Sequence, residues 1–210
     1  MSSEDDPFTG HICRDLCDEA VDVLSQPKPS VKIEDVQWKS LGRLVVTIPQ
    51  IPSMPPGSDS ISKVTLEEPK KYAQPGKVPV RISQIDLNQL HVKVQLHDTI
   101  AKVNSAYIEA GKEHEILTSH QLELFTIMNN YQDLYYPGRT LENGEEIRLV
   151  YCLHAANHII KTRNTVLHHN ARMNKKNRAD VPDEFRDQGL VRPKVLIVVP
   201  FREQARRYGS

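Results

Sequence analysis

The chain has 210 residues, of which 39% are apolar, 26% charged and 6% aromatic, and its 27 basic and 27 acidic side chains cancel. This length fits one domain or two small ones. No apolar run exceeds five residues, which excludes a membrane-spanning helix of about 20 residues. The first residues are acidic and carry no secretory signal, and three cysteines cannot form a disulfide scaffold, so we expect a reducing compartment.

The zero net charge hides two local imbalances. The first 22 residues hold Arg14 as their one base against seven acids. The stretch from Lys161 to Arg178 has no acid and six bases: Lys161, Arg163, Arg172, Lys175, Lys176 and Arg178. A basic stretch of this kind is suited to neutralising phosphates or to nuclear import, and it is also compatible with a solvated loop.

Residues 1–25 form the first of three regions. Apolar residues recur at spacings of three and four between His11 and Ser25 and predict one short amphipathic helix, which Pro27 ends. Cys13 and Cys17 would lie one turn apart on it, but without a second cysteine pair they are poor zinc ligands.

Residues 26–116 form an extended, proline-rich region with short strands. Leu44–Ile48 is a β-favouring run, and apolar and polar residues alternate over Leu90–Leu96, which predicts two strands. Seven prolines lie between Pro49 and Pro79, where we expect a mobile loop. We therefore expect this part of the chain to be partly disordered.

Residues 117–210 have the pattern of an α/β domain. Thr118 and Gln121 have the spacing of a capping box and predict a helix start. The helix would carry an apolar face of four residues: Leu122, Phe125, Met128 and Tyr131. A short aromatic strand is expected at Asp133–Tyr136, ended by Pro137-Gly138.

A second helix is predicted to begin at Asn143, with Glu146 as its capping-box partner, and to end near Arg163. Arg172–Pro182 is polar and loop-like. Val195–Val199 is a continuous β-favouring run, typical of a strand buried on both faces in a parallel sheet. Pro200 then opens another helix.

The residues from Val195 to Ala205 resemble a strand followed by motif Ia of DEAD-box RNA helicases, P-T-R-E-L-A, here Pro-Phe-Arg-Glu-Gln-Ala. Four longer segments point to one particular family among the helicase relatives. They are Asn129–Leu134, Asn143–Glu146, Leu153–His158 and Asp187–Lys194. Together they resemble the digestive organ expansion factor family, also called small nucleolar RNA-associated protein 25. The resemblance covers residues 117–206 best and is thin over 26–90. It implies a degenerate helicase relative, present only through motif Ia.

The chain departs from a working helicase at its phosphate loop. The pattern G-x-x-x-x-G-K-[ST] supplies backbone amides and a lysine to the phosphates. Here Arg139 replaces the lysine, Asp133 stands at the first glycine, and Glu145 and Glu146 lie where the next helix begins and would repel a triphosphate. Gln121 has two interpretations, an adenine-reading glutamine or the helix cap, and the cap needs no ligand.

The remaining helicase parts are also missing. The sequence holds no D-E-A-D tetrad and no second lobe. We therefore expect an α/β fold made of an incomplete, degenerate RecA-like (P-loop NTPase-like) first lobe after a partly disordered N-terminal region. Whether the chain is a fragment or a natural short form stays open.

The resemblance implies a non-catalytic scaffold or RNA-binding subunit of the small-subunit processome, acting in nucleolar pre-ribosomal RNA processing and 40S ribosome biogenesis. Pre-ribosomal RNA, small nucleolar RNA and processome proteins are the implied partners, without a membrane. An ATP-dependent helicase and an inactive fragment are the alternatives. No cofactor or metal is expected, because the pair His154 and His158 lacks the glutamate and third ligand of a zinc site.

Candidate RNA-contacting residues are cations near motif Ia and in the basic stretch. Arg202 begins the helix after the predicted strand, where ligands of open α/β sheets bind, and its guanidinium can pair with phosphate. The other candidates are Lys175, Lys176, Arg178 and Lys194. In the alternative interpretation Arg202 pairs with Glu203 or another nearby carboxylate.

Overall fold

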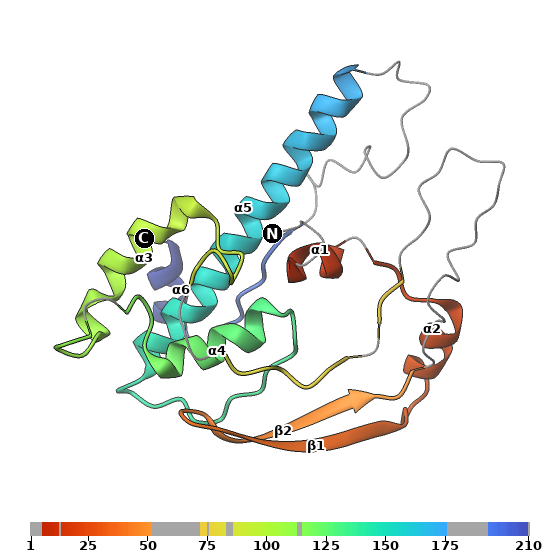
Figure 1. The fold of residues 1–210 in the computed structure, drawn as a ribbon, viewed down its shortest axis with the longest axis horizontal. Helices are drawn as coiled ribbons and strands as arrows, with labels where there is room; N and C mark the ends of the chain where they lie inside the picture. Colours follow the sequence, from red (N-terminus) through yellow and green to blue (C-terminus); the bar gives the residue numbers. More distant parts are fainter. Residues whose placement is uncertain are drawn as a thin grey trace. The chain divides into compact units, whose positions relative to one another are not determined.

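The computed structural model describes residues 6–12, 14–51, 72–74, 76–82, 86–112, 115–175 and 193–209 (Figure 1). The chain divides into two compact units, Met1–Asn157 and His158–Ser210. Helix α5 (Gly144–Lys175) runs through the boundary between them. Within the described ranges, no helix is both long and apolar enough to cross a bilayer. Most of the predicted loop Pro49–Pro79 lies outside the described residues.

The N-terminal segment forms two short helices where the sequence predicted one. α1 (Pro7–Ile12) and α2 (Asp18–Leu24) are separated by a non-helical stretch, in which Asp15 forms a parallel bridge with Tyr72. The Ala73 amide donates to the Asp15 carbonyl at 2.8 Å. This long-range pairing interrupts the helical pattern, so the prediction of a single helix from His11 to Ser25 was wrong. Cys17 is buried just before α2, and Cys13 lies outside the described residues.

A β-hairpin follows, made of β1 (Val31–Trp38) and β2 (Gly42–Pro49). The strands pair antiparallel, from Val31 opposite Pro49 to Trp38 opposite Gly42, and Gly42 has a φ of 74° that favours glycine at this turn. The predicted strand Leu44–Ile48 is confirmed as part of β2. Over Ile33–Trp38 and Gly42–Ile48 every second residue is more buried, which is the pattern of a sheet with one face toward the protein.

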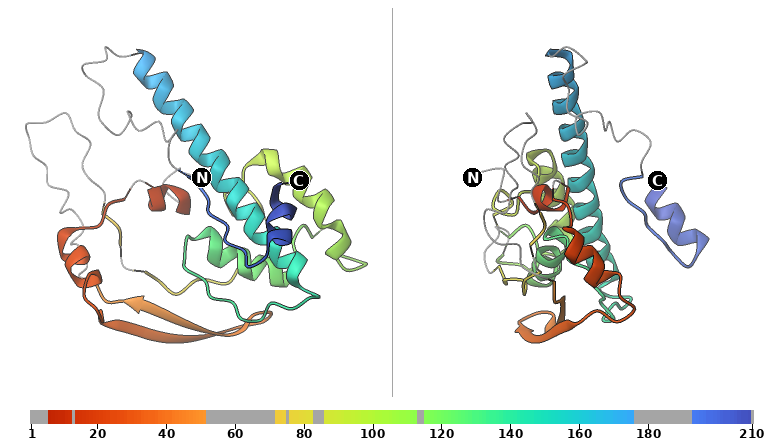
Figure 2. Two further views of the ribbon diagram at one scale, coloured as in Figure 1. Left: turned by 180° about the vertical axis from the view of Figure 1, so that it is seen from behind. Right: turned by 90° about the vertical axis from the view of Figure 1, so that its right-hand side faces the viewer.

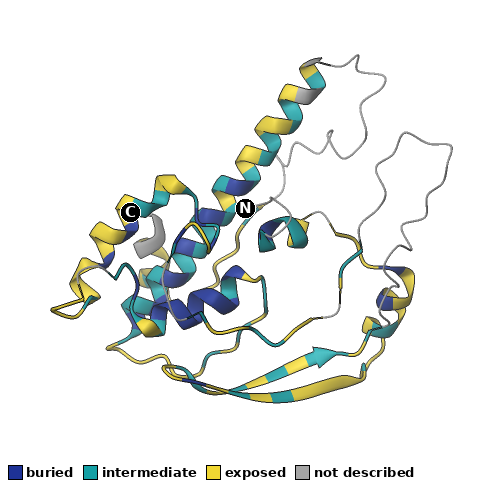
Figure 3. Ribbon diagram, viewed as in Figure 1, coloured by how far each residue is buried: buried dark blue, intermediate teal, exposed yellow. Residues whose placement is uncertain are grey.

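The core of the first unit is helical. It is built around α3 (His97–Asn104), α4 (Ser119–Asn129) and the first turns of α5. Its buried residues are Leu87, Leu90, Val92, Ile100, Leu117, Leu122, Leu124, Phe125, Ile147, Val150 and Leu153. Figure 3 shows that α4 is buried around most of its circumference, as expected for a helix enclosed by other elements.

The capping box of α4 is confirmed. The Gln121 amide donates to the Thr118 hydroxyl at 3.2 Å, and the Thr118 amide donates to the Gln121 side-chain oxygen at 2.9 Å. The predicted apolar face holds for Leu122 and Phe125, which are buried, and for Met128, which is half-buried. Tyr131 lies beyond the end of the helix, in a left-handed conformation with a φ of 56°.

Tyr131 holds α1 against the core. Its ring stacks on His11 at 4.2 Å, tilts against Phe8 at 6.4 Å and meets His154 of α5 edge-on at 5.0 Å. Burial raises the pKa of the Tyr131 phenol, and the nearby Asp6 carboxylate raises it further. The phenol therefore stays neutral in this cluster.

The predicted strand at Leu90–Leu96 was wrong. Leu90 and Val92 are buried, but His91 between them has a φ of 53°, and Val94–Leu96 forms the 3-10 helix η2 that leads into α3. Two buried asparagines determine this shape. Asn129 donates to the Leu90 carbonyl at 2.8 Å, and the Asn157 side-chain oxygen accepts from the Lys93 amide at 3.0 Å. A second short 3-10 helix, η3 (Ser105–Tyr107), follows α3.

A buried glutamate joins three distant segments of the first unit. Glu123 of α4 has a side chain only 1% exposed, and its Oε2 accepts from the amides of Ser40 and Leu41, each at 2.9 Å. Its Oε1 accepts from Arg81 at 2.6 Å. Burial alone would raise the pKa of Glu123, but the Arg81 guanidinium and the two amides outweigh burial and lower the pKa. The hairpin turn is thereby fixed to α4.

The expected RecA-like sheet is not seen among the described residues, whose sheet is a two-stranded antiparallel hairpin. Asp133–Tyr136 has no regular secondary structure, so the prediction of a strand there was wrong. The combination of helices and strands is compatible with the α/β class.

We predict that Glu123→Gln lowers the free energy of unfolding by about 2 kcal/mol, because the substitution removes the buried charge to which the Arg81 side chain and the Ser40 and Leu41 amides donate. The lowered pKa means that this contribution is complete above the ordinary value of 4.5 and is lost as pH falls through the folded-state pKa. Denaturant titrations should therefore show less acid sensitivity in the variant than in the parent. Glu109→Gln, at an exposed pair with Lys112, is the control and should match the parent. Equal acid sensitivity of parent and Glu123→Gln would contradict this role.

A second prediction concerns the amide pair of Asn104 and Gln121, which exchange hydrogen bonds of 2.7 and 2.8 Å and are both almost fully buried. Asn104→Leu alone strands the Gln121 amide and should cost about 2 kcal/mol of unfolding free energy. The double variant Asn104→Leu with Gln121→Met also removes the stranded Gln121 side-chain amide, so that only the bonds of this pair to the Thr118 amide and the Ile116 carbonyl are still lost. Its destabilisation should be smaller than the sum of the two single effects by about 1 kcal/mol. Strict additivity in chemical denaturation would show that the pair does not act as a unit.

Candidate functional site: the loop before helix α5 and the basic C-terminal segment

The candidate phosphate loop is closed by its own side chains. The Thr140 amide donates to Asn143 Oδ1 at 2.7 Å, and the Asn143 amide donates to the Thr140 hydroxyl at 3.2 Å. Asn143 Nδ2 donates to the Gly138 carbonyl at 2.9 Å. The threonine hydroxyl and two of the loop amides, those of Thr140 and Asn143, are therefore bonded within the loop and not free for a phosphate.

Side chains lie against both glycines of this loop, and at Gly138 the contact is too close for a larger residue. A Cβ at Gly138 would approach the Tyr136 hydroxyl oxygen to 2.8 Å, closer than real contacts allow. Tyr136 in turn packs against His120 of α4, with ring centroids 5.6 Å apart. A Cβ at Gly144 would lie 3.4 Å from Arg139 Nε, so the Arg139 side chain covers the start of α5. Arg139 is thus placed over the helix start by local packing.

The start of α5 carries negative charge. Helix α5 begins directly after Asn143, as predicted, and Glu145 and Glu146 occupy its first turn. Glu145 pairs with Arg148, one turn further along the helix. The Asn143 side chain bonds to the preceding loop, so the predicted pairing with Glu146 is replaced by the reciprocal pair with Thr140. Carboxylates at this position interact favourably with the helix dipole and oppose a bound anion.

Gln121, the second candidate nucleotide contact, serves as the helix cap. Its side-chain oxygen accepts from the Thr118 amide and from Asn104, and its side-chain nitrogen donates to Asn104. The residue is 1% exposed. Of the two interpretations, the capping one is therefore observed in the structure.

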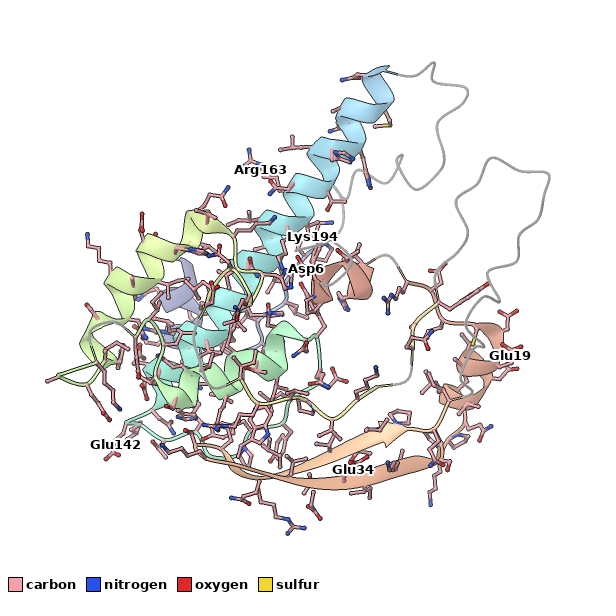
Figure 4. All side chains as sticks on the ribbon, in the orientation of Figure 1. Asp6, Glu19, Glu34, Glu142, Arg163 and Lys194 are labelled. Atoms are coloured by element: carbon pink, nitrogen blue, oxygen red, sulfur yellow. The ribbon has the colours of Figure 1, made fainter. Side chains whose placement is uncertain are left out.

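The candidate RNA-contacting cations lie in the second unit. Arg202 is the first residue of α6 (Arg202–Gly209) and is exposed, whereas Lys194, labelled in Figure 4, is half-buried. Glu203 pairs with Arg206 at 3.0 Å, and the described residues show no ion pair of Arg202 with Glu203. Helix α5 extends beyond its predicted end near Arg163 and includes Arg172. Lys175 is its last residue. Lys176 and Arg178 fall outside the described residues.

The segment before α6 differs from its prediction. Val195–Val199 forms no strand, and Leu196 and Val198 are 85% and 83% exposed. A strand buried on both faces was therefore the wrong expectation for this segment. No strand pairs with this segment among the described residues. The helix predicted after Pro200 is confirmed as α6.

The possible metal pair on α5 is engaged in other contacts. His154 meets the Tyr131 ring. In the described ranges, no cluster of three histidine, cysteine, aspartate or glutamate side chains could hold a metal ion. Cys152 is half-buried, and burial raises the pKa of its thiol.

Sequence reasoning missed the environment of Glu123 and the exposure of Tyr135 and Leu141. Tyr135, shortly before the closed loop, is 88% exposed, and Leu141, within the loop, is fully exposed. The Pro137-Gly138 turn gave a signal for an exposed loop tip. For Glu123, its position between Leu122 and Leu124 in the sequence was a signal for a buried, paired carboxylate.

Comparisons with known proteins identify relatives over the whole chain. A family model described as "UTP25, NTP hydrolase-like domain" matches residues 131–209. The chain is 40% identical over 205 residues to the U3 small nucleolar RNA-associated protein 25 homolog of Mus musculus, covering 96% of this chain and 23% of that protein. It is 40% identical over 211 residues to the Homo sapiens homolog, covering 99% and 24%. No solved structure matches significantly.

The chain spans about a quarter of the length of the curated relatives it matches. The match extends through the hairpin, α4, the closed loop and α6, so it covers both units. The chain therefore belongs to the U3 small nucleolar RNA-associated protein 25 family.

Proposed function

We propose that this chain is a non-catalytic, RNA-contacting scaffold part of a U3 small nucleolar RNA-associated protein, acting in early pre-ribosomal RNA processing. The names of the relatives associate those proteins with U3 small nucleolar RNA. On this proposal the chain works in the nucleolus, in the processome that leads to the 40S subunit. Pre-ribosomal RNA, small nucleolar RNA and processome proteins are its partners, and it needs no cofactor.

The closed loop before α5 is the observation that carries the non-catalytic assignment. A nucleotide site needs free amides and a lysine at the phosphates. Here the loop amides of Thr140 and Asn143 are bonded within the loop, and Glu145 and Glu146 stand at the helix start. Opening this loop for a triphosphate would break these bonds and bring like charges together.

The proposal keeps the three-part organisation of residues 1–25, 26–116 and 117–210, with the last part as the opening of a degenerate RecA-like lobe. The assignment to a RecA-like lobe is supported by the chain order, because the β-favouring segment Val195–Val199 is followed closely by helix α6. If Val195–Val199 pairs as a strand in the complete lobe, the start of α6 lies at its carboxyl end, where open α/β sheets bind ligands.

RNA contact on this proposal is made to the sugar-phosphate backbone. The exposed Arg202 at the start of α6 combines a guanidinium with free helix amides. Lys194, Lys175, Lys176 and Arg178 add positive charge. Backbone contacts do not distinguish bases, so binding is sequence-tolerant and weakens as salt rises.

The competing function is an ATP-dependent RNA helicase, which the description of the matching family as NTP hydrolase-like favours. We predict that titration with labelled ATP and Mg²⁺ gives no saturable binding, because the phosphate loop lacks its lysine and is closed. A dissociation constant in the micromolar range that Arg139→Ala abolishes would replace the scaffold proposal with the enzyme.

For RNA, we predict that single-stranded RNA binds with a salt-dependent affinity. Changing Lys175, Lys176 and Arg178 to alanine should flatten the salt slope by up to about 0.7 for each phosphate that is no longer neutralised. Arg202→Ala should act in the same direction. The matched control changes three exposed cations elsewhere, Lys39, Arg43 and Lys112, to alanine and should leave the slope unchanged. If neither the triple variant nor Arg202→Ala alters affinity or slope, these residues are not an RNA site.

A further inference from the structure

The outer edge of β1 offers a backbone that is ready to pair. In Figures 1 and 2, β2 lies between β1 and helix α4, so β1 is the outer strand of the hairpin. Among the described residues the sheet has two strands, and none lies on the other side of β1. A two-stranded sheet is marginal in water, and an eight-residue edge is long enough to accept a third strand.

The hydrogen-bond pattern shows which groups this edge presents. The Gln50 amide donates to the Ser30 carbonyl at 2.8 Å, so Ser30 and Gln50 form a hydrogen-bonded pair next to the hairpin ladder. Backbone groups of successive residues point to opposite sides of a strand. The even-numbered residues of β1 therefore face β2. Val31, Ile33, Asp35 and Gln37 present their N–H and C=O groups outward.

The side chains along this edge have a self-complementary order. Ile33 is 63% exposed and Val31 is 41% exposed, on the face that points away from the protein. Lys32 and Glu34 flank Ile33 and pair with each other at 2.7 Å along the strand. Glu34 is labelled in Figure 4. When a second copy of this strand runs antiparallel to the first, the base of each copy faces the acid of the other and the apolar residues face each other.

We propose that the outer edge of β1 pairs antiparallel with the same edge of a second copy of this chain, centred on Ile33. Ile33 then faces Ile33 of the second copy as a hydrogen-bonded pair, and Val31 faces Asp35 in the same way. Lys32 lies opposite Glu34 of the second copy in the non-hydrogen-bonded position, where side chains approach most closely. The two hairpins become one four-stranded sheet with a twofold axis.

Charge complementarity selects this occupant and this register. An antiparallel strand suited to the edge needs an acid opposite Lys32, an apolar residue opposite Ile33 and a base opposite Glu34. Read in its own direction, that strand has the order base, apolar, acid, which is the order of β1 itself. Shifting the register by one residue would move these side chains to the wrong faces and remove both ion pairs.

Sedimentation velocity of residues 1–210 over a range of concentrations tests the pairing. The parent should dimerise reversibly. Lys32→Glu places like charges opposite each other twice and should weaken the dimer about tenfold or more, as should Glu34→Lys. The double variant Lys32→Glu with Glu34→Lys restores both pairs and should recover the parent's affinity. Lys112→Glu makes the same charge change far from β1 in sequence and should have no effect.

Ile33→Pro separates edge pairing from hairpin stability. The Ile33 N–H points away from β2, so proline at this position removes only an outward donor. The hydrogen bonds between β1 and β2 are kept. This variant should be monomeric with its hairpin intact, as judged by unchanged circular dichroism. A dimer that survives both Ile33→Pro and the charge reversals would overturn the proposal, and so would a parent that is monomeric at every concentration.

Cysteine cross-linking tests the register. Ile33→Cys places two thiols in facing positions, within reach of a disulfide after small adjustment. At Gln37, four residues further along, the two copies lie roughly 27 Å apart along the strands. Oxidation should link the Ile33→Cys dimer and leave the Gln37→Cys dimer unlinked. Cross-linking at residue 37 without cross-linking at residue 33 would exclude this register.

Discussion

The buried carboxylate of Glu123 is the constraint on which the arrangement of the first unit depends. It accepts hydrogen bonds from the hairpin turn and from Arg81, segments 83 and 42 residues away in sequence. A charge this deeply buried is tolerated only when it is paired and fully hydrogen-bonded, so the turn, the Arg81 segment and α4 must come together or not at all. The orientation of the hairpin, and with it the outer edge of β1, follows from this contact.

Buried polar side chains have the same role elsewhere in the molecule. Asn129 and Asn157 satisfy the backbone of the turn around His91, and Asn104 and Gln121 satisfy each other beneath the start of α4. In the loop before α5, Asn143 acts similarly from a more exposed position. Irregular segments are thus held by specific side chains of neighbouring helices. The loop that a nucleotide-binding relative would open to phosphate is held closed by the same kind of interaction.

Local signals in the sequence predicted local features well. The Thr118–Gln121 box, the β2 run, the helix start after Asn143 and the helix after Pro200 depend on residues within a few positions of one another. The secondary-structure predictions were wrong where contacts with residues far away in the sequence determine the backbone conformation. Leu90–Leu96 alternates like a strand, yet Asn129 and Asn157, 39 and 66 residues away from their partners there, impose a left-handed turn. The Asp15–Tyr72 bridge divides the predicted first helix in the same way. Val195–Val199 shows the opposite case, a β-favouring run without a sheet neighbour among the described residues.

A non-catalytic function requires that the loop from Gly138 to Asn143 stays closed with or without nucleotide. Hydrogen–deuterium exchange of its amides, measured with and without ATP and Mg²⁺, tests this most directly. We predict that the Thr140 and Asn143 amides exchange at the same rates in both conditions, and that Asn143→Ala accelerates exchange of the Thr140 amide because its acceptor is removed. Slower exchange across residues 138–146 on addition of ATP and Mg²⁺ would show that the loop opens to a phosphate and would contradict the account.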